Sequence, residues 1–299
     1  MFEYVKGFLK MNDVDFRENV SLKTISPIRI GGVAKIVAYP DSASKYVEII
    51  RFLQSIKCNF RTVGRMSNIL PPDDVYIGVI IKTDRLRKFF IDNGVLYTQA
   101  GITTAILASE LCRLGLSGFE ELSGIPGSIG GAICGNAGAF GREIADVISS
   151  VTFYSPCDDS VYKASADELR FSYRDSAFKH KMGYIITAEF NLVHTDIDSV
   201  SSRMREVKKE REKTQPTGEL SLGSTFKRPP GNIPAAKMID QCGLKGHRIG
   251  SAEISKKHAG FIVNRGNATA EEYIKLADYA SECVYEKFGV RLEKEVELL

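Results

Sequence analysis

A glycine-rich stretch between Gly118 and Gly141 constrains the fold of this chain more than any other feature of its sequence. The stretch holds 8 of the 26 glycines in the 299 residues. Its densest part reads Ser123-Gly124-Ile125-Pro126-Gly127-Ser128-Ile129-Gly130-Gly131-Ala132-Ile133-Cys134-Gly135-Asn136-Ala137-Gly138. Glycine adopts positive φ and lets backbone N–H groups approach a phosphate closely. The stretch therefore predicts a ligand-binding loop, with close packing or simple turns as the alternatives.

A second candidate loop follows a predicted strand at Phe60–Val63. It reads Gly64-Arg65-Met66-Ser67-Asn68-Ile69. A turn at this point would direct backbone N–H groups, the Ser67 hydroxyl and the Asn68 amide toward an anion. A plain turn at the end of a strand explains this segment equally well. Two such loops together favour a cofactor that carries a diphosphate.

Several common nucleotide and metal sites are excluded by pattern. The sequence has no G-x-x-x-x-G-K-[ST] motif, and it lacks the strand, G-x-G-x-x-G, helix and acidic residue of a dinucleotide fold. None of the six cysteines forms a C-x-x-C pair, so we expect neither a metal site nor a disulfide framework. The formal net charge of +3 is weak, and nucleic acid is not an expected partner.

Hydrophobic periodicity predicts alternating strands and helices, and hence an α+β architecture. The expected strands are 34–39, 60–63, 77–81, 95–99, 148–154, 184–193 and 260–264. The expected helices are 42–54, 103–114, 196–213, 233–242 and a long one between Thr269 and Gly289. Thr269 with Glu272 forms a capping box, and Gly289 is a stop signal. The apolar side of the 196–213 helix is expected to carry Ile197, Val200, Met204 and Val207.

The two loops, together with Ile28-Arg29-Ile30-Gly31-Gly32-Val33-Ala34, resemble an FAD-binding domain of the vanillyl-alcohol-oxidase type. Within that superfamily the chain is most similar to the UDP-N-acetylenolpyruvoylglucosamine reductase family. Further matching stretches run in the order of the family from about residue 24 to 297. They are Phe171-Ser172-Tyr173-Arg174-Asp175-Ser176, Gly223-Ser224-Thr225-Phe226-Lys227-Arg228-Pro229, Gly243-Leu244-Lys245-Gly246, Lys257-His258-Ala259-Gly260-Phe261-Ile262-Val263-Asn264 and Leu292-Glu293-Lys294-Glu295-Val296.

The resemblance implies a two-part FAD-binding domain, at 1–83 and 84–195, followed by a linker helix and an α+β substrate-binding domain at 196–299. The span between Arg174 and Ser224 is short, which is similar to the branch without a tyrosine-bearing lid (type II). Met66 stands where the family usually has glycine, so we expect a different backbone path there. The family uses non-covalent FAD, takes hydride from NADPH and reduces UDP-N-acetylglucosamine enolpyruvate to UDP-N-acetylmuramate for peptidoglycan.

Three catalytic residues carry over by position in the matching motifs. Arg174 is expected to bind the substrate carboxylate and the developing enolate through its planar guanidinium. Ser224 is expected to protonate the neighbouring carbon. Glu295 is expected to donate a hydrogen bond as a neutral acid, with its pKa raised by burial and by the nearby anion. Read without the resemblance, the three are more ordinary. Arg174 is a surface partner of Asp175 or an anchor at a domain interface, Ser224 is a turn residue, and Glu295 lies in a half-exposed strand.

The expected binding residues form two further sets. Those for the cofactor are Gly64, Arg65, Ser67, Asn68, Ile69, Ile125, Pro126, Gly127, Ser128, Gly130, Gly131, Gly135, Asn136 and Gly138. Those for the substrate are Tyr173, Lys227, Arg228, His258 and Asn264.

The surroundings of the enzyme are also predicted. No run reaches the roughly 18–20 apolar residues that cross a bilayer, and the N-terminus lacks the order of a secretion signal. We therefore expect a cytoplasmic enzyme with a UDP-sugar substrate, no membrane insertion and no obligate protein partner. Two alternatives remain open: another FAD-dependent oxidoreductase of the superfamily, and a nucleotide-binding module without catalysis. Since no histidine lies in 64–70, flavin attached covalently through that loop is not expected.

Overall fold

The computed structural model describes residues 1–231 and 233–299, which form two compact units. Unit 1 consists of Met1–Glu18, Ile36–Arg65 and Gly78–Glu210, and unit 2 consists of Asn19–Lys35, Met66–Ile77 and Arg211–Leu299. Unit 2 therefore combines the C-terminal part of the chain with two short segments from its first 77 residues. The division at 1–83, 84–195 and 196–299 stays a prediction. The three hydrophobic clusters draw mainly on residues 5–86, 96–190 and 222–292.

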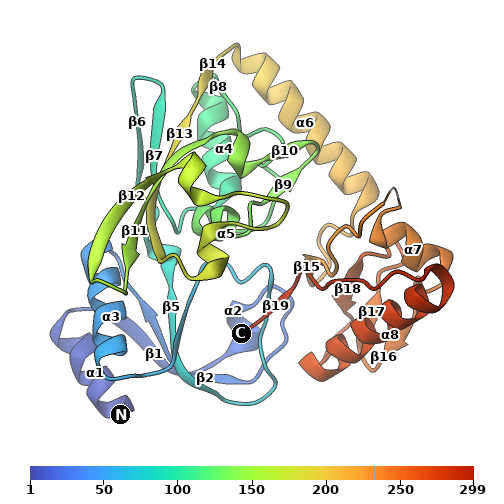
Figure 1. The fold of residues 1–299 in the computed structure, drawn as a ribbon, viewed down its shortest axis with the longest axis horizontal. Helices are drawn as coiled ribbons and strands as arrows, with labels where there is room; N and C mark the ends of the chain where they lie inside the picture. The colour runs from blue at the N-terminus through green and yellow to red at the C-terminus, as the bar shows by residue number, and fades with distance from the viewer. Residues whose placement is uncertain (232) are drawn as a thin grey trace. The chain divides into compact units, whose positions relative to one another are not determined.

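The first sheet has the strand order β1-β2-β5-β3. Its strands are β1 (Asp15–Ser21), β2 (Val33–Tyr39), β5 (Tyr76–Lys82) and β3 (Phe60–Val63), and β3 runs parallel to β5. In unit 1, helices α1 (Phe2–Met11) and α3 (Ala43–Ser55) lie next to each other, in blue in Figure 1. The rings of Phe8 and Phe52 stack between them at 3.8 Å, so the two helices and the strands share one core.

The second sheet of unit 1 is antiparallel, with the order β12-β11-β13-β7-β6 (Figure 1). Its strands are β6 (Phe89–Asp92), β7 (Val95–Gln99), β11 (Ile148–Ser155), β12 (Ser160–Ser165) and β13 (Tyr184–Asn191). Asn93 and Gly94, both at positive φ, join β6 to β7, as expected for an Asn-Gly hairpin. Helices α4 (Thr104–Arg113) and α5 (Ile129–Cys134) pack into the core of this sheet.

The main sheet of unit 2 has the order β15-β18-β17-β16. Its strands are β15 (Ser221–Ser224), β18 (Phe261–Asn264), β17 (Ala252–Ile254) and β16 (Arg248–Ile249). Helices α7 (Ala235–Gln241) and α8 (Ala270–Phe288), orange to red in Figure 1, pack against this sheet. In the same unit, β4 (Ile69–Leu70) pairs in parallel with β19 (Glu297–Leu298) near the C-terminus.

The remaining α-helices and strands are short, apart from one charged helix. They are α2 (Leu22–Ile25), β8 (Leu116–Ser117), β9 (Gly138–Ala139), β10 (Arg142–Glu143), β14 (Val193–His194) and α6 (Ile197–Thr214). On α6, Val200 and Val207 are buried, whereas Ile197 on the same side is 51% exposed. Ile197 is the first residue of α6, where few neighbours can cover it. Among residues 1–231 and 233–299, no helix is both long and apolar enough to cross a membrane.

Candidate functional site

The two predicted glycine loops meet inside unit 1. Strand β3 ends at Val63, and a Cβ atom added to the next residue, Gly64, would lie 2.0 Å from the Ser128 hydroxyl oxygen. A side chain at Gly64 would therefore collide with Ser128, and only glycine allows this approach. Ser128 is buried, and its oxygen accepts a hydrogen bond from the Gly131 N–H at 3.3 Å. Gly131 itself is exposed, as is Pro126.

A buried lysine supports this junction, and the sequence patterns did not reveal it. Lys82, the last residue of β5, is 4% exposed, and its ammonium group donates to the Gly64 carbonyl oxygen at 2.9 Å. Burial lowers the pKa of Lys82, whereas the Asp84 carboxylate, 3.1 Å away, acts in the opposite direction. Lys82 thus fixes the peptide at which the first loop leaves its strand.

The rest of the first loop belongs to unit 2 and forms a tight turn. The Ile69 N–H donates to the Met66 carbonyl at 3.3 Å, so Ser67 and Asn68 occupy the two central positions. Met66 has φ 55°, in the left-handed region that favours glycine. Its side chain is buried, which helps to hold a methionine in this unusual conformation.

Arg174 also has a left-handed backbone, with φ 56°. It is the second central residue of a turn that Ser172 and Asp175 close by exchanging two backbone hydrogen bonds, at 3.1 and 3.2 Å. The guanidinium donates to the Gly138 carbonyl at 2.8 Å and lies 5.0 Å from the centre of the Tyr173 ring. The Arg174 side chain is therefore directed by the C-terminal end of the glycine-rich stretch.

Asn136 ties this stretch to the turn of Arg174. Its side chain is 1% exposed. The amide nitrogen donates to the Ser172 carbonyl at 2.9 Å and to Glu143 at 2.8 Å, and the amide oxygen accepts from the Ala145 N–H at 3.1 Å. Since both polar atoms are used, Asn136 serves as a frame for the turn that begins at Ser172.

In unit 2, Ser224 and Glu295 lie on neighbouring extended segments. The Glu295 N–H donates to the Thr225 carbonyl at 2.8 Å, and the Lys227 N–H donates to the Glu293 carbonyl at 2.9 Å. Gly223, at φ 79°, allows the irregular register that β15 shows just before this point. The Asn68 amide reaches the same segment and donates to the Glu295 carbonyl at 3.0 Å.

Comparisons with known proteins cover both the N-terminal and the C-terminal parts of the chain. Residues 34–165 match the profile of an FAD-binding domain, and residues 215–299 match the C-terminal domain of UDP-N-acetylenolpyruvoylglucosamine reductase. The reductase of Caldicellulosiruptor bescii is 39% identical over 98% of this chain and 93% of its own length. That of Carboxydothermus hydrogenoformans is 41% identical over 94% and 93%.

This chain belongs to the UDP-N-acetylenolpyruvoylglucosamine reductase family. The crystal structure of UDP-N-acetylenolpyruvylglucosamine reductase from Thermus caldophilus superposes with a TM-score of 0.80, at 31% identity over 95% of this chain and 98% of that one. The predicted family, the α+β fold with an FAD-binding domain and the FAD cofactor are therefore confirmed. The branch without a lid stays a prediction, and so do the roles of the individual residues.

The expected substrate-binding residues of this family member differ in how they are held. Asn264 is buried, and its amide bonds to the carbonyls of Ile28 and Arg29 and to the N–H groups of Gly266 and Ala268. Lys227 pairs with Glu293 at 2.6 Å.

The other three are a histidine in a turn and two exposed side chains. Burial lowers the pKa of the His258 imidazole, whose Nδ1 accepts from the Gly260 N–H at 3.2 Å. Arg228 and Tyr173 are exposed. Of the predicted substrate residues, these two leave the largest share of their side chains open to a ligand.

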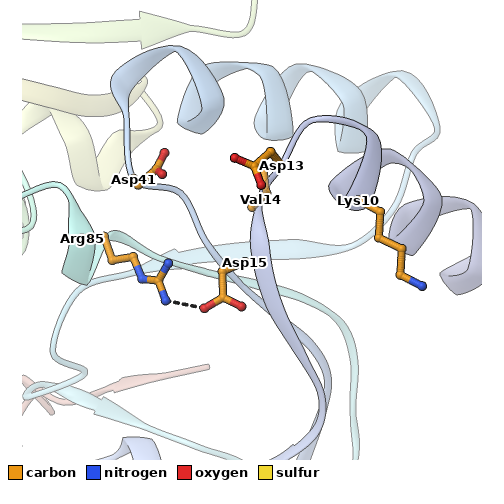
Figure 2. Close-up of a pocket in the computed structure, with 6 residues that line it drawn as sticks. All are labelled: Lys10, Asp13, Val14, Asp15, Asp41 and Arg85. Carbon is orange, nitrogen blue, oxygen red and sulfur yellow. Dashed lines mark hydrogen bonds and ion pairs between the residues drawn. The ribbon is translucent and has the colours of Figure 1, made fainter.

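A polar surface pocket lies elsewhere in unit 1. Figure 2 shows its lining residues, Lys10, Asp13, Val14, Asp15, Asp41 and Arg85, and the ion pair that joins Arg85 to Asp15. Lys45 contacts Asp13 and Asp41, each at 3.3 Å. None of the predicted site residues lines this pocket. Within the described part of the chain, no group of three or more His, Cys, Asp or Glu side chains could hold a metal ion.

Proposed function

We propose that this chain reduces UDP-N-acetylglucosamine enolpyruvate to UDP-N-acetylmuramate with NADPH, in the synthesis of peptidoglycan precursors. The observation that carries the proposal is the pairing of the Ser224 and Glu295 segments inside the domain, 215–299, that matches this family's own C-terminal domain. The product would serve cell-wall biogenesis, and through it cell shape and division. The small molecules that this reaction requires are the UDP-sugar and NADPH.

The residues of the two loops fit a bound FAD. At Gly64 the loops approach so closely that no side chain could be added, and Gly131, beside Ser128, is exposed. We assign the diphosphate to the backbone of Gly64 and Arg65 and to the glycine-rich stretch, all of which belong to unit 1. FAD, when bound, supplies the chemistry of accepting a hydride from NADPH and delivering it to the methylene carbon of the substrate.

Arg174 binds the carboxylate of the enolpyruvyl group. A guanidinium presents its donors in a planar fork that matches a carboxylate, and it stays charged at all relevant pH values. Its anchoring to the Gly138 carbonyl sets the direction of the fork before the substrate arrives. The same positive charge stabilises the enolate that develops when hydride adds to the double bond.

Ser224 donates the proton that completes the reduction. Hydride adds at the methylene carbon, electron density moves toward the carboxylate, and the Ser224 hydroxyl protonates the carbon that bears the ether oxygen. A serine is a weak acid, but a carbanion-like acceptor is very basic and the positioning of the donor adds to the effect. Glu295 assists as a neutral acid that donates a hydrogen bond, since an ionised carboxylate would repel the enolate.

We place the reaction in the cytoplasm, because NADPH and nucleotide-activated sugars are supplied there. No obligate protein partner is part of this proposal. The polar network around Asn136 and Arg174 and the paired segments around Glu295 each lie within one unit of a single chain.

An anaerobic titration tests the function directly. The purified protein should be yellow, NADPH should bleach the flavin, and the enolpyruvyl sugar nucleotide should restore its absorbance. Restoration by oxygen alone would favour an oxidase of the same superfamily, and a colourless protein would favour a nucleotide-binding module. A Glu295→Gln variant should keep the bleaching by NADPH and lose most of the reoxidation by the sugar nucleotide. Full reoxidation in that variant would contradict the role of Glu295.

A further inference from the structure

Asn68 was predicted to direct its amide toward the cofactor, yet the structure uses that amide elsewhere. The Nδ2 atom donates to the main-chain carbonyl of Glu295 at 3.0 Å, across 227 positions of sequence and within unit 2. The Asn68 carbonyl also accepts from the Glu297 N–H at 3.0 Å. Asn68, in the turn at 66–69, therefore holds two alternate residues of the C-terminal segment, Glu295 and Glu297.

The Asn68 side-chain bond reaches Glu295, which the backbone pairing of β4 with β19 does not include. The parallel ladder between β4 and β19 joins Ile69 to Glu297 and Leu70 to Leu298. Glu295 lies two residues before the beginning of β19, so it is outside this ladder. The Asn68 side chain extends the connection past the end of the ladder to the residue that is proposed to act on the substrate.

The main chain of Glu295 is consequently fixed on both sides. Its N–H donates to the Thr225 carbonyl at 2.8 Å, next to Ser224, and its carbonyl accepts from Asn68. With the backbone fixed, the carboxyl group can move only among the rotamers of its own side chain. A hydrogen-bond donor in a reaction must be placed within a fraction of an ångström, and a displacement of about 1 Å can cost about 10²-fold in rate.

We infer that Asn68 is a positioning residue for Glu295. Its side chain joins the turn at 66–69 to the C-terminal segment that carries Glu295, and both lie in unit 2. This inference rests on the proposed role of Glu295. It assigns Asn68 an effect on one half of the reaction: reduction of the flavin by NADPH does not involve Glu295, whereas reoxidation by the sugar nucleotide does. Retention of FAD is a third quantity, and it is measured separately.

The test compares Asn68→Ala and Asn68→Asp with the parent enzyme, each saturated with FAD. Asn68→Asp keeps the size of the side chain and removes the donor, so it serves if the alanine variant fails to fold. We expect reoxidation by the enolpyruvyl sugar nucleotide to slow by about 10-fold or more, with reduction by NADPH changed less than about 3-fold. Leu298→Ala is the matched control, because Leu298 lies in β19 and is 61% exposed; both half-reactions should stay unchanged in it.

A double variant separates positioning from general damage. If Asn68 acts through Glu295, Asn68→Ala should add little to the loss already caused by Glu295→Gln. Additive losses, equal slowing of both half-reactions, or normal reoxidation in both Asn68 variants would overturn the inference. Failure of the proposed function looks different, because Glu295→Gln alone would then reoxidise at the parent rate. In that case the inference about Asn68 falls with it.

Discussion

Arg174 in unit 1 is held through its side chain, whereas Glu295 in unit 2 is held through its main chain. The Arg174 guanidinium is bonded directly, to the Gly138 carbonyl, and its backbone takes a left-handed conformation. Glu295 is instead held through its own N–H and carbonyl. The difference matches the two tasks. The Arg174 cation is directed in advance toward an anion through its side chain, whereas the position of Glu295 is set through its main chain.

The largest effect should come from the unit 2 side, by removal of the proton donor. Ser224→Ala should slow flavin reoxidation by the sugar nucleotide by about 10²–10⁴-fold, the usual contribution of a general acid. Reduction by NADPH should be unaffected, because no proton from Ser224 is needed in that step. Rapid mixing of pre-reduced enzyme with the sugar nucleotide measures the first rate, and NADPH mixing measures the second. Equal slowing of both would show that Ser224 acts on structure and not on proton transfer.

Removing the hydrogen bonds by which Asn136 holds the Arg174 turn should give the next largest effect. Asn136→Ala removes the donor to the Ser172 carbonyl and the acceptor for the Ala145 N–H, so the Arg174 turn should loosen. We expect kcat/KM for the sugar nucleotide to fall by about 10–10²-fold, mainly through KM, because Arg174 is proposed to bind its carboxylate. Asn136→Asp, which keeps the acceptor, should lose less. A fall in kcat alone would argue against a positioning role.

A buried charge in the unit 2 sheet tests how stability, and not chemistry, depends on pH. Glu253 in β17 is 1% exposed and contacts Arg248 and Arg265. Burial acts to raise the pKa of Glu253, but the hydrogen bonds and charges of the two arginines outweigh it and lower the pKa. A carboxyl with a lowered pKa in the folded state stabilises the protein at neutral pH, and this contribution is lost as the pH falls through that pKa.

Glu253→Gln should therefore cost about 2 kcal/mol of unfolding free energy at pH 7, less than for a fully buried pair because both arginines are partly exposed. The difference from the parent should shrink as the pH falls. Urea unfolding at several pH values measures it. A difference that stays constant with pH would mean that packing, and not charge, is what the substitution removed.

The elements with local signals could be predicted from the sequence. Strand β7 has the predicted bounds, and α8 begins at its capping box and ends at Gly289. Helix α5 was not predicted, since two of its six residues are glycine, which disfavours helix. Lys82 was also missed, because a lysine at the end of an apolar strand is ordinarily exposed.

The sequence predicted the candidate residues of the site but not the hydrogen bonds that join them. The motifs named Arg174, Ser224 and Glu295 as candidates, and the two loops at Gly64 and Ser128. The contacts that hold them join residues far apart, such as Asn68 and Glu295, and no single-sequence periodicity reports such pairs. Membership of 19–35 and 66–77 in unit 2 was hidden for the same reason.

The smallest effect should come from the capping box of α8, which lies behind the unit 2 sheet. The Thr269 hydroxyl accepts from the Glu272 N–H at 3.1 Å, and Glu272 accepts from the Thr269 N–H at 3.1 Å. Thr269→Ala should cost about 1 kcal/mol of unfolding free energy, and Thr269→Ser should cost less because it keeps the acceptor.

Both half-reactions should keep the parent rates in these two variants, measured below the onset of unfolding. The main chain of Glu295 is fixed by Thr225 and Asn68, and neither bond involves the N-terminus of α8. Slower reoxidation in Thr269→Ala would mean that the position of Glu295 depends on the helix packing behind the sheet. Glu295 would then be positioned by packing at a distance, whereas Arg174 is positioned by direct hydrogen bonds.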